Sequence, residues 1–193
     1  MIPYGVNRAS KMNNKEIHVV LDRDGTLIKH IHYLSNSDEV SLLPGVIEGI
    51  IKLQLNKVSF SLHTNQSGVG RKFFSMNEVI QCNNKMFSLL NLDESAFQEI
   101  CIAPEAPDET IQYRKPSPNF GNELVRNYHY DVKNIFYIGD TLSDYETAIN
   151  LGCNFVGVNT GLVQLSSLPD STIQNINIKK DFLSAVDYVV EFI

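Results

Sequence analysis

The sequence contains no long apolar run, no tryptophan and only three cysteines among its 193 residues. No stretch approaches the ~20 apolar residues of a membrane-spanning helix, and residues 1–16 lack the continuous apolar segment of a signal peptide. Cys82, Cys101 and Cys153 are odd in number and form no CxxC pair, a pattern typical of reduced thiols in a reducing compartment. We therefore expect a cytoplasmic protein with no membrane partner.

Basic residues are also scarce, because 16 Lys and Arg stand against 22 Asp and Glu, and the formal net charge is -6. Nucleic acids and anionic membranes reward a basic surface, so we expect no nucleic-acid partner. A small anionic substrate remains compatible, since a metal ion and a few local cations can reverse the field inside one cleft. The apolar share of 43% indicates a globular chain. We predict one domain over residues 17–193, preceded by a flexible tail over residues 1–16.

Short apolar runs alternate with amphipathic segments along the chain. The runs predict strands over residues 17–21, 58–62, 99–103, 135–138 and 155–158. Helices are predicted to begin near Pro44, after Ser75 and at Pro118, to end before Gly152, and to cover residues 182–193. This alternation predicts an α/β fold, a doubly wound parallel sheet in a three-layer α/β/α arrangement. In such sheets the ligand binds beyond the carboxyl ends of the strands.

Details of three helices follow from local patterns. In the helix after Pro44, Val46, Ile47, Ile50 and Ile51 are expected to form the buried face. Ser75 and Glu78 have the spacing of a capping box. Gly152 is expected to end its helix in a left-handed conformation.

An acidic pair follows the first predicted strand directly, in the segment Asp22-Arg23-Asp24-Gly25-Thr26. Two carboxylates at positions i and i+2 can face one site if the chain turns between them, and Gly25 permits that turn. Such a pair suits phosphoryl transfer, because one carboxylate attacks phosphorus while the other protonates the leaving oxygen and later activates water. Alone, the segment is equally compatible with a solvated acidic turn.

Two further polar groups follow the second and third predicted strands. Thr64, in the segment 64–68, offers a hydroxyl and backbone N–H groups to a phosphate oxygen. Lys115 offers a compact cation that can neutralise both a phosphoryl group and an attacking carboxylate. Taken singly, each is better explained as an ordinary polar loop or a basic surface pair.

A fourth group follows the fourth predicted strand, where Asp140 and Asp144 are one helical turn apart. Mg²⁺ prefers carboxylate and carbonyl oxygens, so Asp140 can complete a site begun by Asp22 and the backbone carbonyl of Asp24. Asp144 is expected to orient Asp140 or Lys115, or to hold a metal-bound water. Asp140 is also compatible with a helix cap. The four groups stand in order at four successive strand ends, which chance placement explains poorly.

This ordered set resembles the haloacid dehalogenase (HAD) superfamily over residues 17 to about 161. The resemblance implies that Asp22 is the nucleophile and Asp24 the acid/base. It also implies that Thr64 and Lys115 hold the phosphate and that Asp140 binds the metal. The strings LDRDGTLI, LLPGV, TNQSGVGR and RKPSPN resemble the group of histidinol-phosphate and D-glycero-D-manno-heptose 1,7-bisphosphate phosphatases.

That group is nearly capless, so loops close over a small phosphorylated substrate, and a monomer is our default expectation. The similarity implies substrate contacts for Asn65, Arg71 and Arg114. Members of the group commonly carry a zinc loop, CxH followed by CxC before RKP. Here Cys101 is present, but Ala103, Ile111 and Tyr113 hold the other ligand places. One thiolate cannot make a four-ligand site, so we predict no zinc and a loop held by prolines and apolar contacts.

The resulting hypothesis is a Mg²⁺-dependent phosphomonoester hydrolase that forms an aspartyl-phosphate on Asp22 and acts on a sugar phosphate such as D-glycero-D-manno-heptose 1,7-bisphosphate. Histidinol phosphate and a polynucleotide 3′-phosphate are alternative substrates. A receiver domain shares the aspartate, hydroxyl, lysine and Mg²⁺ but lacks the second aspartate, and a catalytically silent binding protein is a further alternative. His18 is interpreted as packed or half-exposed, and His63 is expected to face away from Thr64. His30, His32 and Tyr33 are interpreted as a solvated loop, with lining of the substrate entrance as the alternative.

Overall fold

The computed structural model describes residues 16–169 and 176–193, so the predicted tail lies, except for Glu16, outside the described residues. A parallel sheet of six strands in the order β3-β2-β1-β4-β5-β6 forms the centre of the fold. The strands are β1 (His18–Leu21), β2 (Ser59–Asn65), β3 (Ile100–Ala103), β4 (Ile135–Gly139), β5 (Asn154–Val158) and β6 (Asn177–Lys179). The chain leaves β1 toward β2 and later returns to its other side at β4, which makes the end of β1 a topological switch point.

The five predicted strands are confirmed, with two differences. β2 continues three residues beyond its predicted end, because His63, Thr64 and Asn65 pair with Cys101, Ile102 and Ala103 of β3. These polar residues lie in the sheet instead of in a loop. β6 was not predicted, since its three residues form no apolar run.

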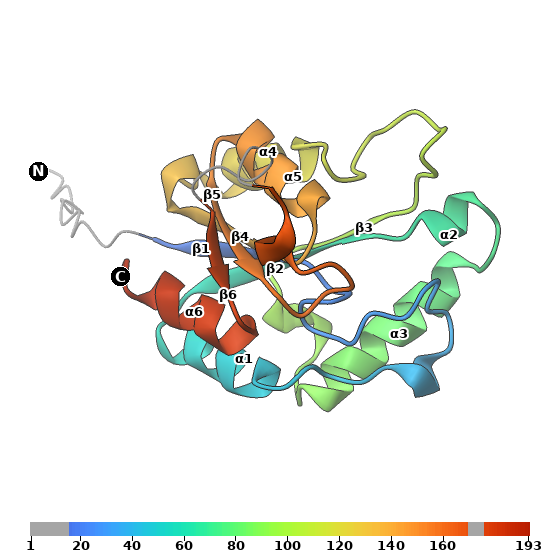
Figure 1. Cartoon of the computed structure of the whole chain (residues 1–193), viewed down its shortest axis with the longest axis horizontal. Coiled ribbons are helices and arrows are strands. Elements are labelled where there is room, and N and C mark those ends of the chain that lie inside the picture. The colour runs from blue at the N-terminus through green and yellow to red at the C-terminus, as the bar shows by residue number, and fades with distance from the viewer. Residues whose placement is uncertain (1–15, 170–175) are drawn as a thin grey trace, which may run out of the picture.

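Helices cover both faces of the sheet, which confirms the three layers (Figure 1). One face carries α1 (Val46–Leu55), α3 (Met76–Leu89) and α6 (Phe182–Val190), and the other carries α4 (Asn119–Tyr128) and α5 (Leu142–Leu151). A short α2 (Ser67–Gly70) follows β2. Single 3-10 turns occur at Ser37–Glu39, Glu94–Ala96, Val132–Asn134 and Leu165–Ser167.

Two apolar clusters fill the space on either side of the sheet. Val19 and Leu21 of β1 pack with residues of α1, α3 and α6, whereas Val20 packs with residues of α4 and α5. This alternation is the period of two that a strand imposes on its side chains. The central strand is therefore fixed from both faces, and the residue that follows it is held at a defined place.

The predicted face of α1 needs correction. Ile47 and Ile51 are 44% and 48% exposed, and the buried face consists of Val46, Gly49, Ile50 and Leu53. Gly49 belongs to that face because a Cβ there would lie 2.6 Å from the Phe182 ring of α6, so this ring packs directly on the α1 backbone.

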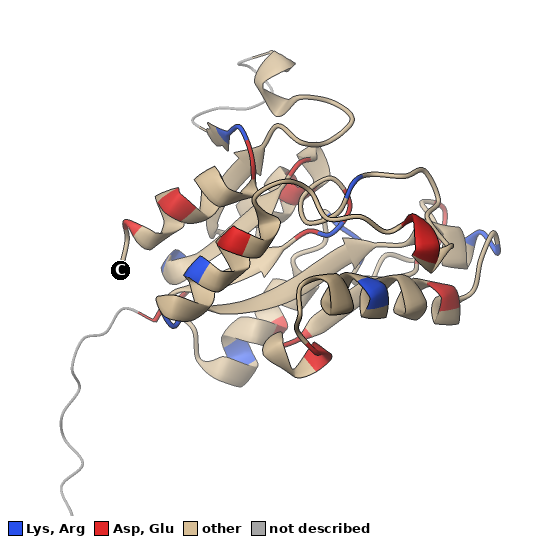
Figure 2. Ribbon diagram, turned by 90° about the horizontal axis from the view of Figure 1, so that it is seen from below, with Lys and Arg blue, Asp and Glu red and all other residues tan. Residues whose placement is uncertain are grey.

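Two of the predicted helix ends are confirmed, whereas α6 ends at Val190, three residues before its predicted end. Ser75 and Glu78 form a capping box at the start of α3, and Gly152 ends α5 with φ 79°. In the ribbon of Figure 2, Lys and Arg positions are interspersed with Asp and Glu positions along helices and loops. Within the described ranges, no helix has the length and apolar character that crossing a bilayer requires.

Candidate active site

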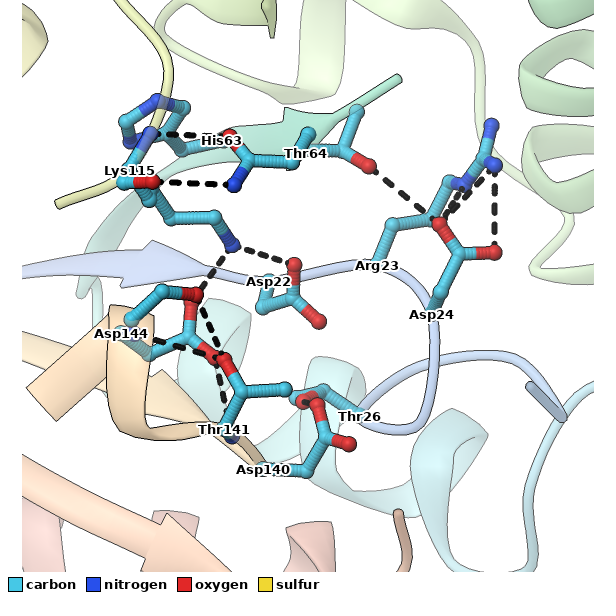
Figure 3. A network of polar contacts seen from close by, with 12 residues as sticks. Asp22, Arg23, Asp24, Thr26, His63, Thr64, Lys115, Asp140, Thr141 and Asp144 are labelled. Carbon is cyan, nitrogen blue, oxygen red and sulfur yellow. Dashed lines mark hydrogen bonds and ion pairs between the residues drawn. The ribbon is translucent and has the colours of Figure 1, made fainter. Parts of the chain in front are cut away.

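The carboxyl ends of β1, β2 and β4 bring the predicted residues to one place (Figure 3). Asp22 follows β1, and its backbone N–H donates to the Ile138 carbonyl of β4 at 2.9 Å. Thr64 lies near the end of β2, and Asp140 follows β4 directly. Residues separated by more than 100 positions in the sequence thus meet at the switch point of the sheet.

The Lys115 ammonium lies between two carboxylates and donates to Asp22 Oδ1 and Asp144 Oδ1, each at 2.5 Å. The three side chains are between 0% and 8% exposed, so the charges interact with little screening by solvent. Burial opposes the charged form of Lys115, but Asp144 and Asp22 outweigh it and raise the pKa of this lysine. Lys115 is therefore a fixed cation beside the Asp22 carboxylate.

Burial dominates at the acidic residues. It raises the pKa of Asp22, and the nearby Asp144 and Asp24 raise it further, although Lys115 acts in the opposite direction. Burial likewise raises the pKa of Asp140, with Asp22 and Asp144 adding to it. Ionising all of these acids would therefore create an excess of negative charge that one lysine does not balance.

A divalent cation fits that excess. Among the residues that the structure describes, one group of three acids has metal-binding geometry, and Asp22, Asp140 and Asp144 offer ligand atoms within 4.8 Å of one another. Three ionised carboxylates facing one ammonium leave a charge that Mg²⁺ would balance, and oxygen is its preferred ligand. Asp144 already accepts from Lys115 through Oδ1 and from Thr141 Oγ1 (2.6 Å) through Oδ2. Its contacts therefore suit the orienting role predicted for it.

The Asp140 carboxylate occupies a space that two glycines leave open. A Cβ added at Gly25, which has φ 90°, or at Gly161 would lie 2.3 or 1.9 Å from Asp140 Oδ2. Thr26 Oγ1 also donates to Asp140 Oδ1 at 3.4 Å. The alternative interpretation of Asp140 as a helix cap is wrong, because Thr141 is the N-cap of α5.

Asp24 is turned away from Asp22 and is bound by its own neighbour (Figure 3). Arg23 donates from Nε to Oδ2 at 2.9 Å and from Nη2 to Oδ1 at 3.1 Å. Gln66 Nε2 and Thr64 Oγ1 donate to the same Oδ2 at 3.0 and 3.3 Å. The carboxylate thus has a single orientation, fixed by a guanidinium, an amide and a hydroxyl.

Arg23 is itself fully buried, and its Nη1 donates to Asn83 Oδ1 of α3 at 2.8 Å. No role was predicted for the side chains of Arg23, Asn83 or Gln66. An arginine between two site aspartates in a buried segment was a usable signal, because a buried guanidinium needs acceptors. Asn83, 60 residues away on a helix, carried no such signal.

The predicted substrate residues have different surroundings. Asn65 pairs with the backbone of Lys115, accepting its N–H at 2.9 Å and donating to its carbonyl at 3.2 Å. Arg71 is exposed at the end of α2, and Arg114 is partly buried, with Nη1 donating to the Glu105 carbonyl at 3.3 Å. The structure thus places Asn65 as a support of Lys115.

A cavity of about 200 Å³ opens beside Asp24. His30, His32 and Tyr33 line it together with Phe74 and residues 65–68, and His32 is also exposed to solvent. This position is compatible with the alternative in which these residues line the substrate entrance. The Tyr33 ring packs edge-on against Phe73 at 4.8 Å, an aromatic contact between two loops that the sequence pattern does not reveal.

Two other histidines, His18 and His63, are packed inside the fold. His18 lies between the hydroxyls of Ser59 and Ser61 and is fully buried. His63 contacts the Tyr137 hydroxyl and, at 2.9 Å, the Tyr113 carbonyl. Burial lowers the pKa of both histidines to about 3, so both are neutral at physiological pH.

The loop after β3 does not offer a zinc site. Cys101 is buried, and Ala103, Ile111 and Tyr113 at the other expected places supply no thiolate or imidazole. The expectation that prolines and apolar contacts hold this loop needs correction, because Glu105 Oε1 accepts backbone N–H groups of residues 112–114.

Comparisons with known proteins agree with this geometry. A family model described as HAD-hydrolase-like matches residues 112–185. The D-glycero-beta-D-manno-heptose-1,7-bisphosphate 7-phosphatase of Bordetella bronchiseptica is 31% identical over 144 residues, covering 74% of this chain and 80% of that protein. The histidine biosynthesis bifunctional protein HisB of Legionella pneumophila is 29% identical over 141 residues, covering 72% of this chain but 40% of HisB.

A crystal structure of D,D-heptose 1,7-bisphosphate phosphatase from B. bronchiseptica, complexed with magnesium and phosphate, superposes with a TM-score of 0.80. It is 26% identical and covers 92% of this chain and 99% of that one. Fold and comparisons together define a phosphatase with a HAD-type α/β fold. The chain belongs to the haloacid dehalogenase superfamily, in the group that contains the histidinol-phosphate and heptose-bisphosphate phosphatases, which confirms the resemblance read from its motifs.

Proposed function

We propose that this protein is a Mg²⁺-dependent phosphomonoester hydrolase that acts through an aspartyl-phosphate on Asp22. The observation that carries the proposal is the buried contact of 2.5 Å between Asp22 and Lys115 at the end of β1. A nucleophilic carboxylate beside a fixed cation can approach a phosphate dianion that it would otherwise repel. Thr64 and Lys115 are assigned to the phosphate, and Asp22, the Asp24 carbonyl and Asp140 to the metal.

The first step forms a bond between an Asp22 oxygen and phosphorus while the bond to the leaving oxygen breaks. Asp24 supplies the proton that the leaving alkoxide needs, and the contacts from Arg23 and Gln66 hold its carboxyl group in place. In the second step Asp24 takes a proton from water, which attacks phosphorus and releases Asp22. Mg²⁺, when bound, supplies additional positive charge to the phosphoryl oxygens.

For the substrate we propose a small phosphorylated metabolite, with D-glycero-D-manno-heptose 1,7-bisphosphate first. The cavity of about 200 Å³ beside Asp24 supports this, because the leaving group must lie next to its proton donor. Its polar residues, including His30, His32 and Asn65, suit hydroxyl groups. Arg71 and Arg114 are assigned to the substrate on the family resemblance. The interspersed charges of Figure 2 support a substrate other than nucleic acid.

We further propose that the protein acts as a cytoplasmic monomer, without a membrane partner. The free thiols of Cys82, Cys101 and Cys153 support a reducing compartment.

Phosphate release from a substrate panel tests the proposal. The panel contains heptose 1,7-bisphosphates, other sugar phosphates, histidinol phosphate and a 3′-phosphorylated oligonucleotide, each with Mg²⁺ and with excess chelator. We expect a heptose bisphosphate to be turned over best, with Mg²⁺ required. Asp22→Asn should reduce kcat by roughly 10⁴-fold, whereas Asp38→Asn, a change in an exposed carboxylate, should leave it unchanged.

The outcomes discriminate between the alternatives. Preference for histidinol phosphate or the oligonucleotide would keep the mechanism and replace the substrate. Full activity in Asp22→Asn would contradict the covalent mechanism. A folded protein that turns over nothing on the panel would favour a silent binding protein.

A further inference from the structure

The Glu105 loop, residues 104–114, connects β3 to the segment that carries Lys115. The Glu105 side chain is inside it, with the residue 9% exposed. Its Oε1 accepts three consecutive backbone N–H groups, from Gln112 at 2.9 Å, Tyr113 at 2.6 Å and Arg114 at 3.3 Å. One carboxylate oxygen thus joins the beginning of the loop to its end and closes it into a ring.

The C-terminal end of the loop is hydrogen-bonded to β2. The Tyr113 carbonyl lies 2.9 Å from His63 Nε2 of β2, and the next residue but one, Lys115, pairs with Asn65 through its backbone. The Gln112 carbonyl accepts from Ser117 Oγ and Asn119 Nδ2, both at 2.8 Å. Arg114 lies between these attachment points, so closure of the loop fixes its backbone position.

The N-terminal end of the loop packs against α2. Gly70 N–H donates to the Pro104 carbonyl at 3.0 Å, and a Cβ at Gly70 would lie 2.7 Å from the Ala106 nitrogen and 2.8 Å from the Pro104 oxygen. Glu109 Oε2 accepts the Ala106 N–H at 2.7 Å. The loop is thus docked on a fixed helix at one end and on β2 at the other.

The charges agree with this arrangement. Burial works against ionisation of Glu105, but the N–H groups of Tyr113, Gln112 and Arg114 outweigh it and lower the pKa of Glu105, so this carboxylate is ionised at neutral pH. Burial, with Glu105 nearby, raises the pKa of the Cys101 thiol to about 12. Cys101 is therefore a protonated, packed thiol in β3, just before this loop.

We propose that the Glu105 carboxylate is a positioning residue that closes the loop over residues 104–114 and directs Arg114 toward the substrate without a metal ion. The Arg114 backbone N–H donates to Glu105 Oε1, and the Arg114 guanidinium donates to the Glu105 carbonyl. Lys115 is less dependent on Glu105, since Asp22, Asp144 and Asn65 also hold it. The assignment of Arg114 to the substrate rests on the proposed function, whereas closure of the loop by Glu105 does not.

Amide hydrogen exchange tests loop closure independently of activity. We expect the amides of residues 112–114 to be protected in the full-length protein, with or without excess chelator. Glu105→Ala should accelerate their exchange by at least about tenfold, with the β4 amides as an internal reference. Glu105→Gln keeps a neutral acceptor and should give a smaller acceleration. Glu109→Ala, which removes a carboxylate that bonds only Ala106 in this loop, should leave residues 112–114 unchanged.

Kinetics test the positioning of Arg114. Glu105→Ala should raise KM for the best sugar phosphate by about tenfold and change kcat much less, with partial recovery in Glu105→Gln. Wild-type exchange at residues 112–114 that accelerates on chelation, or no acceleration in Glu105→Ala, would overturn the proposal. If Glu105→Ala does not fold, unchanged exchange in Glu105→Gln would overturn it instead. If the wild type hydrolyses no substrate, the proposed function fails, and the exchange data still decide the role of Glu105.

Discussion

Asp24 owes its orientation to Arg23, a residue that faces away from Asp22 and toward α3 (Figure 3). The guanidinium makes two hydrogen bonds to Asp24 and one to Asn83. A lysine cannot reproduce this planar arrangement of donors. If Asp24 is the general acid, Arg23 matters most for substrates whose leaving group needs a proton.

Arg23→Lys is therefore expected to separate two substrate types. Turnover of a sugar phosphate should fall by about 10²-fold, the lower end of what general acid catalysis contributes. Turnover of p-nitrophenyl phosphate should fall much less, because nitrophenolate leaves without a proton. Steady-state kinetics on both substrates measure this, with Arg126→Lys on an exposed surface as the control. An equal loss on both substrates would contradict the role of Arg23 in orienting the acid.

Residues whose chemistry is local were predictable from the sequence. Asp22 and Asp140 stand directly after strand ends, and Lys115 stands in the string RKPSPN; the structure brings the three together as expected. Arg23 and Asn83 meet across 60 positions, and Glu105 bonds residues 112–114 only because its loop folds back; no local sequence pattern encodes either contact. Their roles therefore became visible only in the structure, while the catalytic assignments themselves stay predictions.

At the scale of elements, α1 and α6 meet where Gly49 faces Phe182. Gly49→Ala gains helix propensity of about 1 kcal/mol, but its Cβ would lie 2.6 Å from the Phe182 ring. Overpacking of this kind costs about 1–3 kcal/mol. We expect a net loss in the free energy of unfolding, measured by urea denaturation, and no comparable loss for the exposed Gln54→Ala. A more stable Gly49→Ala protein would show that the two helices can move apart.

The same contact explains where helix prediction failed. Apolar periodicity favours Ile47 and Ile51 on the buried face of α1. Gly49 carries no hydrophobic signal, although it is the residue on which the Phe182 ring of α6 packs. β6 escaped prediction for a related reason, because its three residues pair with β5 through backbone groups and carry no apolar run. The central strands were predictable because burial on both faces forces continuous apolar sequences.

For the whole molecule, the excess of buried acid predicts a dependence of stability on pH. The pKa values of Asp22 and Asp140 are raised in the folded state, mainly by burial. The folded protein therefore keeps protons that the unfolded chain releases above about pH 4. The contribution of the protonated Asp22 and Asp140 to the free energy of unfolding is present at low pH and is lost as pH rises from about 4 through neutrality. Mg²⁺ requires the ionised carboxylates, so its stabilising effect should grow over the same range.

Thermal denaturation at pH 5 and pH 8, with Mg²⁺ or with chelator, measures this dependence. We expect a larger Mg²⁺-induced rise in Tm at pH 8, and Asp140→Asn should reduce that difference by removing one of the acids. An equal Mg²⁺ effect at both pH values in the wild type would contradict assignment of these carboxylates to the metal.

The central claim is that Asp22 carries the phosphoryl group, and trapping the intermediate tests it most directly. The protein would be mixed with its best substrate and Mg²⁺, quenched in acid within one turnover, digested, and analysed by mass spectrometry. We predict that the peptide containing Asp22 gains the mass of one phosphoryl group, and that Asp22→Asn shows no such gain. A phosphoryl group on another residue, or rapid turnover with no phosphorylated peptide at any quench time, would contradict the account.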